Sequence, residues 1–393
     1  MRKRGWVLLA LILTVVLPAV GCRTTEGGEP GQHSQIDYVF VHGLSGWGSY
    51  DKTYRNMPYW GMLGGDLMQY LGSRGFSCYA ASVSPEDSAW DRACELYAQL
   101  AGTVTDYGEE HSERCGHPRF GRDFSSDPLI PDWETGRRIV LLGHSFGGAT
   151  IRVFSELLAN GSPEEMAVSG PSGTSPLFLG GQGSRVHAVI TLAAPTNGTT
   201  AYDLYEDDTF DIESVRVSGW DEWTGNLFSS RKAAERDGRV ESDYAAFDMH
   251  IDNALALNDS ITTLETVYYF AFPCSATEPG EDGNAHPVRK RMEPMFVRSS
   301  LRMGAYTGMT AGGFTIDESW KENDGLVNTI SAGAPFGAPS ERFEGGEIRP
   351  GVWYVMPVIR GDHMCLQGGM MKRTDIRSFY LNLLKEIDTL PPS

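Results

Sequence analysis

The sequence predicts an α/β protein with a mostly parallel central sheet flanked by helices. Short runs rich in β-branched and aromatic residues alternate with segments of helical spacing, which is the order typical of such sheets. One of these runs leads directly into a glycine-flanked turn, residues 143–147, and then into a helical segment. A chain of 393 residues that is 41% hydrophobic can bury the core that this architecture needs.

Six segments have the composition of strands: residues 36–43, 76–83, 138–144, 185–192, 266–272 and 351–358. Helical spacing is clearest in residues 88–102, one face of which carries Trp90, Ala93, Cys94, Tyr97 and Leu100. A second helix is expected after Gly147, ending at Asn160-Gly161, which is a C-cap signal. A third is expected from about Asp375 to Ile387. Between about residues 202 and 244 the chain becomes acidic with scattered aromatics, which predicts an insertion on top of the sheet.

The amino-terminal segment has the pattern of an export signal. Three basic residues precede an apolar run, residues 6–20, that is short for a membrane span. We therefore expect residues 1–21 to be a signal peptide, residues 22–35 a flexible tether, and residues 36–390 a single domain. Cys22 follows the expected cleavage point, as in a bacterial lipoprotein signal that ends in a lipidated cysteine. The alternative is an ordinary secreted protein with an incidental cysteine there.

The charge balance excludes one class of partner. The chain has 33 basic and 51 acidic residues, a formal net charge of -18. Such a surface repels a phosphate backbone, so a nucleic-acid partner is not expected.

The turn at residues 143–147, Gly-His-Ser-Phe-Gly, has the pattern of a nucleophile elbow. A serine between a strand and a helix is held in a strained, exposed position, and glycines on either side leave room for it. An ordinary glycine turn is the alternative reading. The serine hydroxyl needs a base, and His363 is the only histidine after the last expected strand. Asp324, in the loop before that strand, is the expected acid, with Asp317 and Asp362 as weaker candidates.

An acyl-transfer site also needs donors for the developing oxyanion. In this arrangement the donors are the backbone N–H of the residue after the serine and one from the loop after the first strand. These positions correspond to Phe146 and Leu44.

Several longer motifs resemble one known family, the thermoalkalophilic, zinc-containing true lipases of bacteria (lipase family I.5). The resemblance covers most of the chain from Tyr38 to Leu384, and its motifs are VHGLSGWG, YWGMLGGD, WDRACELYAQLAGTVTDYGEEH, GHPRFGR, GHSFGG, ENDGLVNT and DIRSFYLNLL. It implies an α/β-hydrolase fold, carboxylester hydrolysis, and a catalytic triad of Ser145, Asp324 and His363. It also implies that the insertion at about residues 202–244 is a lid, shorter than is usual in the family.

The resemblance implies a structural zinc ion as well. The positions that match the family's ligands are Asp91, His111, His117 and Asp248. Two imidazoles and two carboxylates suit a closed tetrahedral site. Four unrelated polar residues are the alternative, and Cys115 could compete as a ligand. The family's calcium site is expected to be absent, because Cys365 and Met370 stand where it has carboxylates, and calcium prefers oxygen ligands.

Cysteines in an exported protein tend to pair. We predict a disulfide between Cys274, after the fifth strand, and Cys365, beside the expected catalytic histidine. The alternative is two free thiols. Cys94 is expected to be buried, and Cys78 and Cys115 remain unassigned.

The sequence therefore predicts an exported, lipid-tethered or secreted serine carboxylester hydrolase acting on lipid or ester substrates at a lipid–water interface. Resemblance points to triacylglycerol, whereas a smaller lid favours shorter or more soluble esters. Two readings from other classes remain: an inactive hydrolase fold kept as a surface-binding lipoprotein, and a metal-dependent hydrolase that uses the four expected zinc ligands.

Overall fold

The computed structural model describes residues 36–206, 229–370 and 374–392. The expected signal peptide, Cys22, the tether and residues 207–228 of the expected lid lie outside the described residues. No helix in the described ranges combines the length and apolar character needed to cross a membrane.

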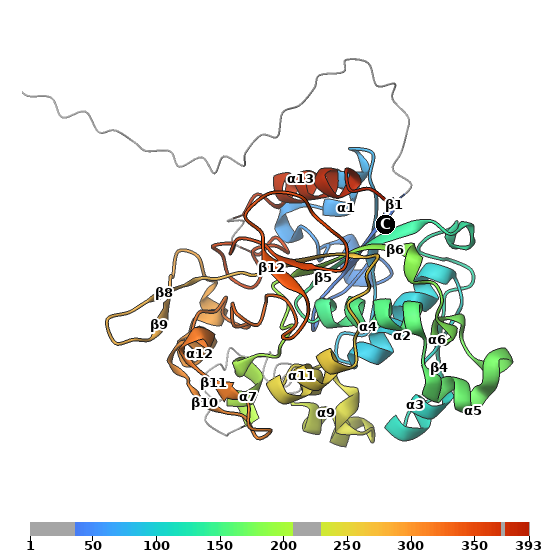
Figure 1. Cartoon of the computed structure of the whole chain (residues 1–393), viewed down its shortest axis with the longest axis horizontal. Coiled ribbons are helices and arrows are strands. Elements are labelled where there is room, and N and C mark those ends of the chain that lie inside the picture. Colours follow the sequence, from blue (N-terminus) through green and yellow to red (C-terminus); the bar gives the residue numbers. More distant parts are fainter. Residues whose placement is uncertain (1–35, 207–228, 371–373, 393) are drawn as a thin grey trace, which may run out of the picture. The chain divides into compact units, whose positions relative to one another are not determined.

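Seven strands form the central sheet in the order β12-β13-β7-β6-β5-β1-β2. Figure 1 labels β1, β5, β6 and β12 of this sheet. Every neighbouring pair in it is parallel, which confirms the predicted α/β class. The strands are β1 (Ile36–Val41), β2 (Ser77–Ala81), β5 (Arg138–His144), β6 (Val186–Leu192), β7 (Tyr268–Phe272), β12 (Ser340–Arg342) and β13 (Trp353–Val355).

Each of the six predicted strand segments contains one of these strands. The sequence analysis missed β12, whose three residues are all exposed and polar and therefore carry no apolar signal. Three two-stranded antiparallel ribbons lie outside the sheet. They are β3 (Val104–Asp106) with β4 (Phe120–Asp123), β8 (Thr277–Pro279) with β9 (Ala285–Pro287), and β10 (Gly308–Met309) with β11 (Thr315–Ile316).

The described helices connect the strands and cover the sheet. They are α1 (Leu67–Gly72), α2 (Ala89–Ala101), α3 (Glu109–Cys115), α4 (Gly147–Asn160), α5 (Pro163–Gly173), α6 (Pro176–Leu179), α7 (Thr200–Glu206), α9 (Ser230–Asp237), α10 (Ala245–Asp248), α11 (Ile251–Asp259), α12 (Val297–Ala305) and α13 (Ile376–Asp388). Short 3-10 turns occur at Lys52–Arg55, Met62–Gly64, Trp133–Thr135, Gly183–Arg185, Glu241–Asp243, Pro294–Phe296 and Glu318–Trp320.

The three predicted helices are present, and their ends follow local capping chemistry. The Ser88 side chain accepts a hydrogen bond from the Asp91 N–H at the start of α2, and Gly102 ends that helix with a φ of 64°. Gly161 closes α4 as expected. Asp375 caps the start of α13 through the Ser378 N–H.

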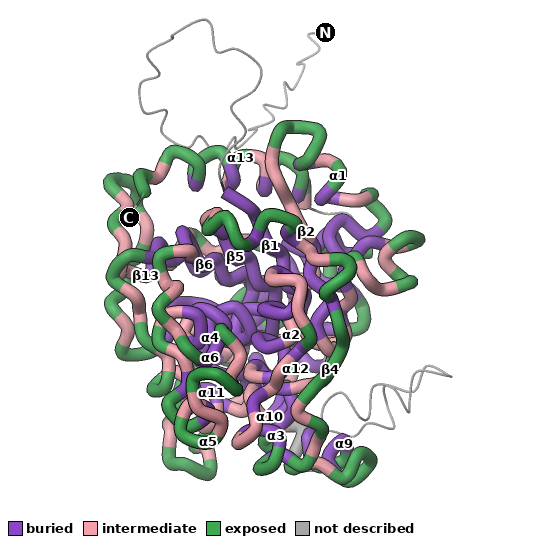
Figure 2. Tube along the Cα trace, turned by 90° about the vertical axis from the view of Figure 1, so that its right-hand side faces the viewer, coloured by how far each residue is buried: buried purple, intermediate pink, exposed green. Residues whose placement is uncertain are grey.

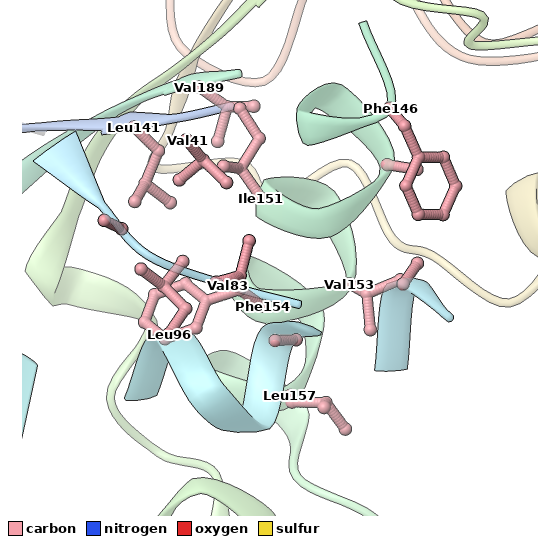
Figure 3. Close-up of a cluster of buried hydrophobic side chains, with 14 of the residues drawn as sticks. Val41, Val83, Leu96, Leu141, Phe146, Ile151, Val153, Phe154, Leu157 and Val189 are labelled. Atoms are coloured by element: carbon pink, nitrogen blue, oxygen red, sulfur yellow. The ribbon is translucent and has the colours of Figure 1, made fainter. Parts of the chain in front are cut away.

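Successive side chains of a strand point to opposite faces of the sheet. Helices pack against the side chains on each face, so the sheet is buried on both sides. Val39 and Val41 of β1 pack with α2 and α4, whereas Tyr38 and Phe40 pack with α1 and α13. Figure 3 shows Ile151 of α4 directed at Val41, Leu141 and Val189. Strands β1, β5 and β6 are accordingly enclosed (Figure 2). This rigid layer fixes the loops that follow the strands, where the candidate site lies.

Candidate active site and candidate metal site

Ser145 lies on a tight turn between β5 and α4. Its φ is 54°, in the left-handed region that costs a non-glycine residue about 1–3 kcal/mol. The turn leaves no room for side chains at its flanks. A Cβ on Gly143 would lie 2.4 Å from the Gly147 carbonyl oxygen, and a Cβ on Gly147 would lie 2.3 Å from that of Val41. The two glycines thus allow the chain to hold the serine at the carboxyl end of the sheet.

Ser145, His363 and Asp324 form a continuous hydrogen-bonded chain. The Ser145 hydroxyl donates to His363 Nε2 at 2.8 Å, and the His363 Nδ1–H donates to Asp324 Oδ2 at 2.9 Å. The other oxygen of Asp324 accepts from the backbone N–H groups of Leu326 and Val327, which fixes the carboxylate. The structure therefore brings together three residues that lie far apart in the sequence, in the geometry of a nucleophile, a base and an orienting acid.

The two weaker acid candidates do not face the histidine ring. Asp317 accepts from the Ser319 N–H at the start of a 3-10 turn. Asp362 accepts from the Glu293 N–H at 2.7 Å. Both carboxylates therefore accept hydrogen bonds from backbone N–H groups.

A second network joins the turn of Ser145 to its neighbours. Complete burial lowers the pKa of His144 to about 3, so this ring is neutral. Its Nε2–H donates to the His363 carbonyl at 2.8 Å, and its Nδ1 accepts from the Tyr59 hydroxyl at 2.7 Å. The Tyr59 oxygen in turn accepts from the Gly43 N–H at 3.1 Å. The network therefore connects the His363 loop to the loop after β1, and sequence reasoning gave no sign of Tyr59.

The two expected oxyanion donors lie beside the serine. A Cβ on Gly43 would come within 3.1 Å of Ser145 Oγ, so the loop that continues to Leu44 passes directly over the hydroxyl. Among the described residues, no hydrogen bond uses the backbone N–H of Leu44 or Phe146. Neither N–H group is committed to an acceptor within these residues.

Arg92 of α2 contacts both segments that carry these donors. Its Nη2 donates to the His42 carbonyl, and its guanidinium carbon lies 5.0 Å from the centre of the Phe146 ring. The side chain is fully buried, and burial lowers its pKa to about 10. Sequence analysis overlooked Arg92, because its two contacts come from distant segments.

A cluster of two histidines and two aspartates lies next to α2. His111 Nε2 is 2.9 Å from Asp91 Oδ1 and 3.2 Å from Asp243 Oδ1. His117 Nε2 is 3.7 Å from Asp91 Oδ1 and 3.4 Å from Asp243 Oδ2. A tetrahedral zinc site with ligand distances of about 2.0–2.1 Å has edges of about 3.3 Å, which matches this spacing.

The expectation of Asp248 as a ligand is wrong, because Asp243 occupies that place. The Glu241–Asp243 turn runs against the start of α2, where Ser88 Oγ donates to Asp243 Oδ1 at 3.1 Å. Asp248 lies in the following helix, and its carboxylate accepts from the Ala89 N–H at 2.8 Å. Burial raises the pKa of Asp248 to about 7. The sequence offers two aspartates five positions apart, and only the backbone path distinguishes them.

The cluster's remaining contacts are compatible with a cation. His117 Nε2 is buried and has no hydrogen-bond partner in the described part of the chain, as expected for an atom that binds a metal. Arg239 donates to both aspartates through their Oδ2 atoms, which leaves the Oδ1 atoms directed at His111. Cys115 Sγ lies 3.8 Å from His111 Nδ1, and Cys115 forms an alternative group of four potential ligands with His111, His117 and Asp243, in which it replaces Asp91. The donors present therefore fit a tetrahedral metal site.

The expected disulfide pair consists of two adjacent free thiols in the structure. Cys274 Sγ and Cys365 Sγ are buried and 3.6 Å apart, with no bond between them. Cys94 is also buried, as predicted. Met370, where the family has a calcium-binding carboxylate, donates its N–H to Glu293 Oε1 at 2.7 Å.

Comparisons with known proteins point to bacterial lipases. Residues 34–218 match the family described as "Lipase-like, C-terminal domain". Lipase 2 of Staphylococcus aureus is 29% identical over 383 residues, covering 89% of this chain and 53% of that protein. The chain thus spans about half the length of the staphylococcal protein.

Two solved structures are similar over nearly the whole chain. EstA from Clostridium botulinum is 32% identical, with a TM-score of 0.78, and the match covers 91% of this chain and 88% of that one. Lipase 1 from Pelosinus fermentans is also 32% identical, with a TM-score of 0.75, covering 91% of this chain and 100% of that one. The resemblance to bacterial lipases is thereby confirmed, and the chain belongs to this family of bacterial lipases.

Proposed function

We propose that the protein is a serine carboxylester hydrolase that works through an acyl-enzyme. The observation that carries the proposal is the 2.8 Å contact between Ser145 Oγ and His363 Nε2, continued at 2.9 Å to Asp324. A serine hydroxyl becomes a useful nucleophile only when a base can accept its proton, and this contact supplies the base.

The reaction follows from the positions of these groups. Ser145 Oγ attacks the ester carbonyl carbon while His363 Nε2 takes the hydroxyl proton, and Asp324 stabilises the resulting imidazolium. The N–H groups of Leu44 and Phe146 bind the oxyanion. His363 then passes the proton to the leaving alcohol. Water, deprotonated by the same imidazole, releases the carboxylic acid and restores the serine.

We assign the substrate to the class of lipid esters, with triacylglycerol as the first candidate. The relatives' names, Lipase 1 and Lipase 2, support this assignment. Shorter or more soluble esters are the alternative, supported by the small size expected for the insertion at about residues 202–244. A chain-length profile on p-nitrophenyl esters, with and without a lipid surface, distinguishes the two.

The metal cluster fits a structural zinc ion, and with it membership of lipase family I.5. Asp91, His111, His117 and Asp243 would hold the ion, connecting α2 and α3 with the Glu241–Asp243 turn. With four protein ligands the site has no open position, so zinc would supply stability rather than chemistry.

Three further assignments belong to the proposal. Residues 1–21 direct export, and Cys22 is the lipid-anchoring residue of a cell-surface protein, with simple secretion as the alternative. Under oxidising conditions Cys274 and Cys365 form a disulfide. Their sulfurs are 3.6 Å apart, and the bond would hold the His363 loop to the strand β7 side of the sheet.

One variant separates the proposal from its rivals. Ser145→Ala should lower turnover of p-nitrophenyl butyrate on the order of a millionfold. Retention of activity in that variant, with loss on chelation at ambient temperature, would instead support a metal-dependent hydrolase. Failure of the wild-type protein on esters of every chain length would support an inactive surface-binding protein.

A further inference from the structure

A cavity lies at the opposite end of the sheet from Ser145. Its volume is about 360 Å³, and its lining includes Arg152 of α4, Asn258 of α11, Tyr269 of β7 and Trp353 of β13. Residues of helices α4 and α11 and of strand β13 line it. Tyr269 and Trp353 stand near the amino-terminal ends of their strands, whereas Ser145 follows the carboxyl end of β5. None of the three triad residues lines this cavity.

The cavity contains a buried cation that has no counter-ion among the described residues. Arg152 is 3% exposed and forms no ion pair within residues 36–206, 229–370 and 374–392. Its Nη2 donates to the neutral amide oxygen of Asn258 at 2.7 Å, and its Nε is buried with no hydrogen-bond partner in those ranges. Burial lowers the pKa of the guanidinium to about 10, so it stays charged at neutral pH. An uncompensated buried charge is costly. The chain has 51 acidic residues, so the lack of a carboxylate beside Arg152 does not reflect a shortage of acidic side chains.

The nearest acidic side chains are turned to other partners or to solvent. Asp259 lines the cavity but is exposed. Glu156, one turn further along α4, accepts from the Thr262 N–H at 2.7 Å and from the Asn160 amide at 2.8 Å. Arg152 therefore has space beside it and no carboxylate bound to it among the described residues.

We propose that this cavity is a binding site for a small carboxylate with an aromatic or short apolar body, recognised by Arg152. A single guanidinium balances one negative charge, which suits a carboxylate better than a phosphate dianion. The walls formed by Tyr269, Trp353 and Pro335 are aromatic or apolar and suit the body of the ligand. The Ser155 hydroxyl also lines the cavity, but it donates to the Ile151 carbonyl at 2.8 Å, so its proton is already engaged.

The site is tested with the whole protein and three probes. Isothermal titration calorimetry and thermal unfolding compare benzoate with benzamide, its neutral analogue of the same shape, and with inorganic phosphate. We expect saturable binding of one benzoate and a rise in Tm. Benzamide and phosphate should bind at least about tenfold more weakly, because benzamide carries no charge and phosphate has no apolar body to pack against the walls. Equal binding of benzamide, preference for phosphate, or no saturable benzoate binding would each overturn the proposal.

Two variants assign the binding to Arg152. Arg152→Met should weaken benzoate binding by at least about tenfold. Asn258→Asp is the second variant, because it places an internal carboxylate 2.7 Å from Arg152 Nη2 and keeps the shape of the side chain. It should abolish the benzoate-induced rise in Tm whether or not Arg152→Met folds.

Ala256→Asp is the matched control for Asn258→Asp. It adds the same charge to the same helix, but at an exposed position, and should bind benzoate as the wild type does. Undiminished benzoate binding by the Asn258→Asp protein would show that the anion binds elsewhere and would overturn the proposal. Equal loss in Ala256→Asp would do the same, because general repulsion would then explain the effect.

Discussion

Removing one hydroxyl, in Tyr59→Phe, should affect stability and turnover together. The Tyr59 oxygen accepts from the Gly43 N–H at 3.1 Å and donates to His144 Nδ1 at 2.7 Å, and both tyrosine and histidine are buried. The variant leaves two buried polar groups without partners. At about 1–3 kcal/mol for each, the free energy of unfolding should fall by about 2–6 kcal/mol.

The same change should loosen the loop that carries the Leu44 N–H. Complete loss of one oxyanion donor typically lowers kcat by about 10²–10³-fold. A displaced donor retains part of its effect, so we expect kcat on p-nitrophenyl butyrate to fall by about 10–100-fold. Urea unfolding followed by tryptophan fluorescence gives the stability, and initial rates at saturating substrate give kcat.

Tyr54→Phe is the matched control for this experiment. Its hydroxyl donates to Asp66 Oδ1 at 3.1 Å, outside the network. That variant should lose only about 0.5–1.5 kcal/mol of unfolding free energy and keep its kcat. If Tyr59→Phe behaved in the same way, the reasoning that the network positions the loop would be refuted.

Three further predictions concern the metal cluster, the thiol pair and pH. Asp243→Ala should abolish zinc retention measured by inductively coupled plasma mass spectrometry, whereas Asp248→Asn should retain the metal; the reverse result would restore Asp248 as the ligand. Protein exported into an oxidising compartment should yield a linked Cys274–Cys365 peptide without reductant. Closing this loop contributes about 4–5 kcal/mol in the chain-entropy model, and free alkylation of both thiols would contradict it. Burial raises the pKa of Glu95 from 4.5 to about 8. The contribution of Glu95 to stability is therefore present at low pH and is lost as pH rises from about 4.5 to about 8. The unfolding free energy of Glu95→Gln should accordingly rise relative to that of the wild type across that interval. A difference between the two proteins that is the same in urea melts at pH 5 and pH 9 would exclude this effect.

The parts of the molecule that could be predicted from sequence are those set by short-range chemistry. The turn at Ser145 depends on glycines within two positions of it, and α2 starts and ends at residues whose capping role is local. Strands β5 and β6 could be found because each is a nearly continuous apolar run that is buried on both faces. Ser145, Asp324 and His363 could be proposed together because, in such a sheet, the acid and the base are expected on the loops before and after the last strand.

The errors and omissions arose where the structure depends on long-range packing. Asp243 and Asp248 are equivalent as sequence letters, and only the path of the chain past Ser88 decides which carboxylate reaches the histidines. Tyr59 and Arg92 make their decisive contacts with residues about 50 or more positions away. No spacing or periodicity encodes such contacts.

The long separation between the members of the triad has a consequence for biosynthesis. Ser145 is made in the first half of the chain, but His363 arrives on a loop that follows β13, and β13 joins the sheet only by pairing with β7. A polypeptide that ends before residue 363 therefore contains Ser145 but not the imidazole that contacts its hydroxyl. Under the proposed mechanism, a chain truncated before His363 has no base to activate Ser145, so late truncation should remove hydrolysis completely.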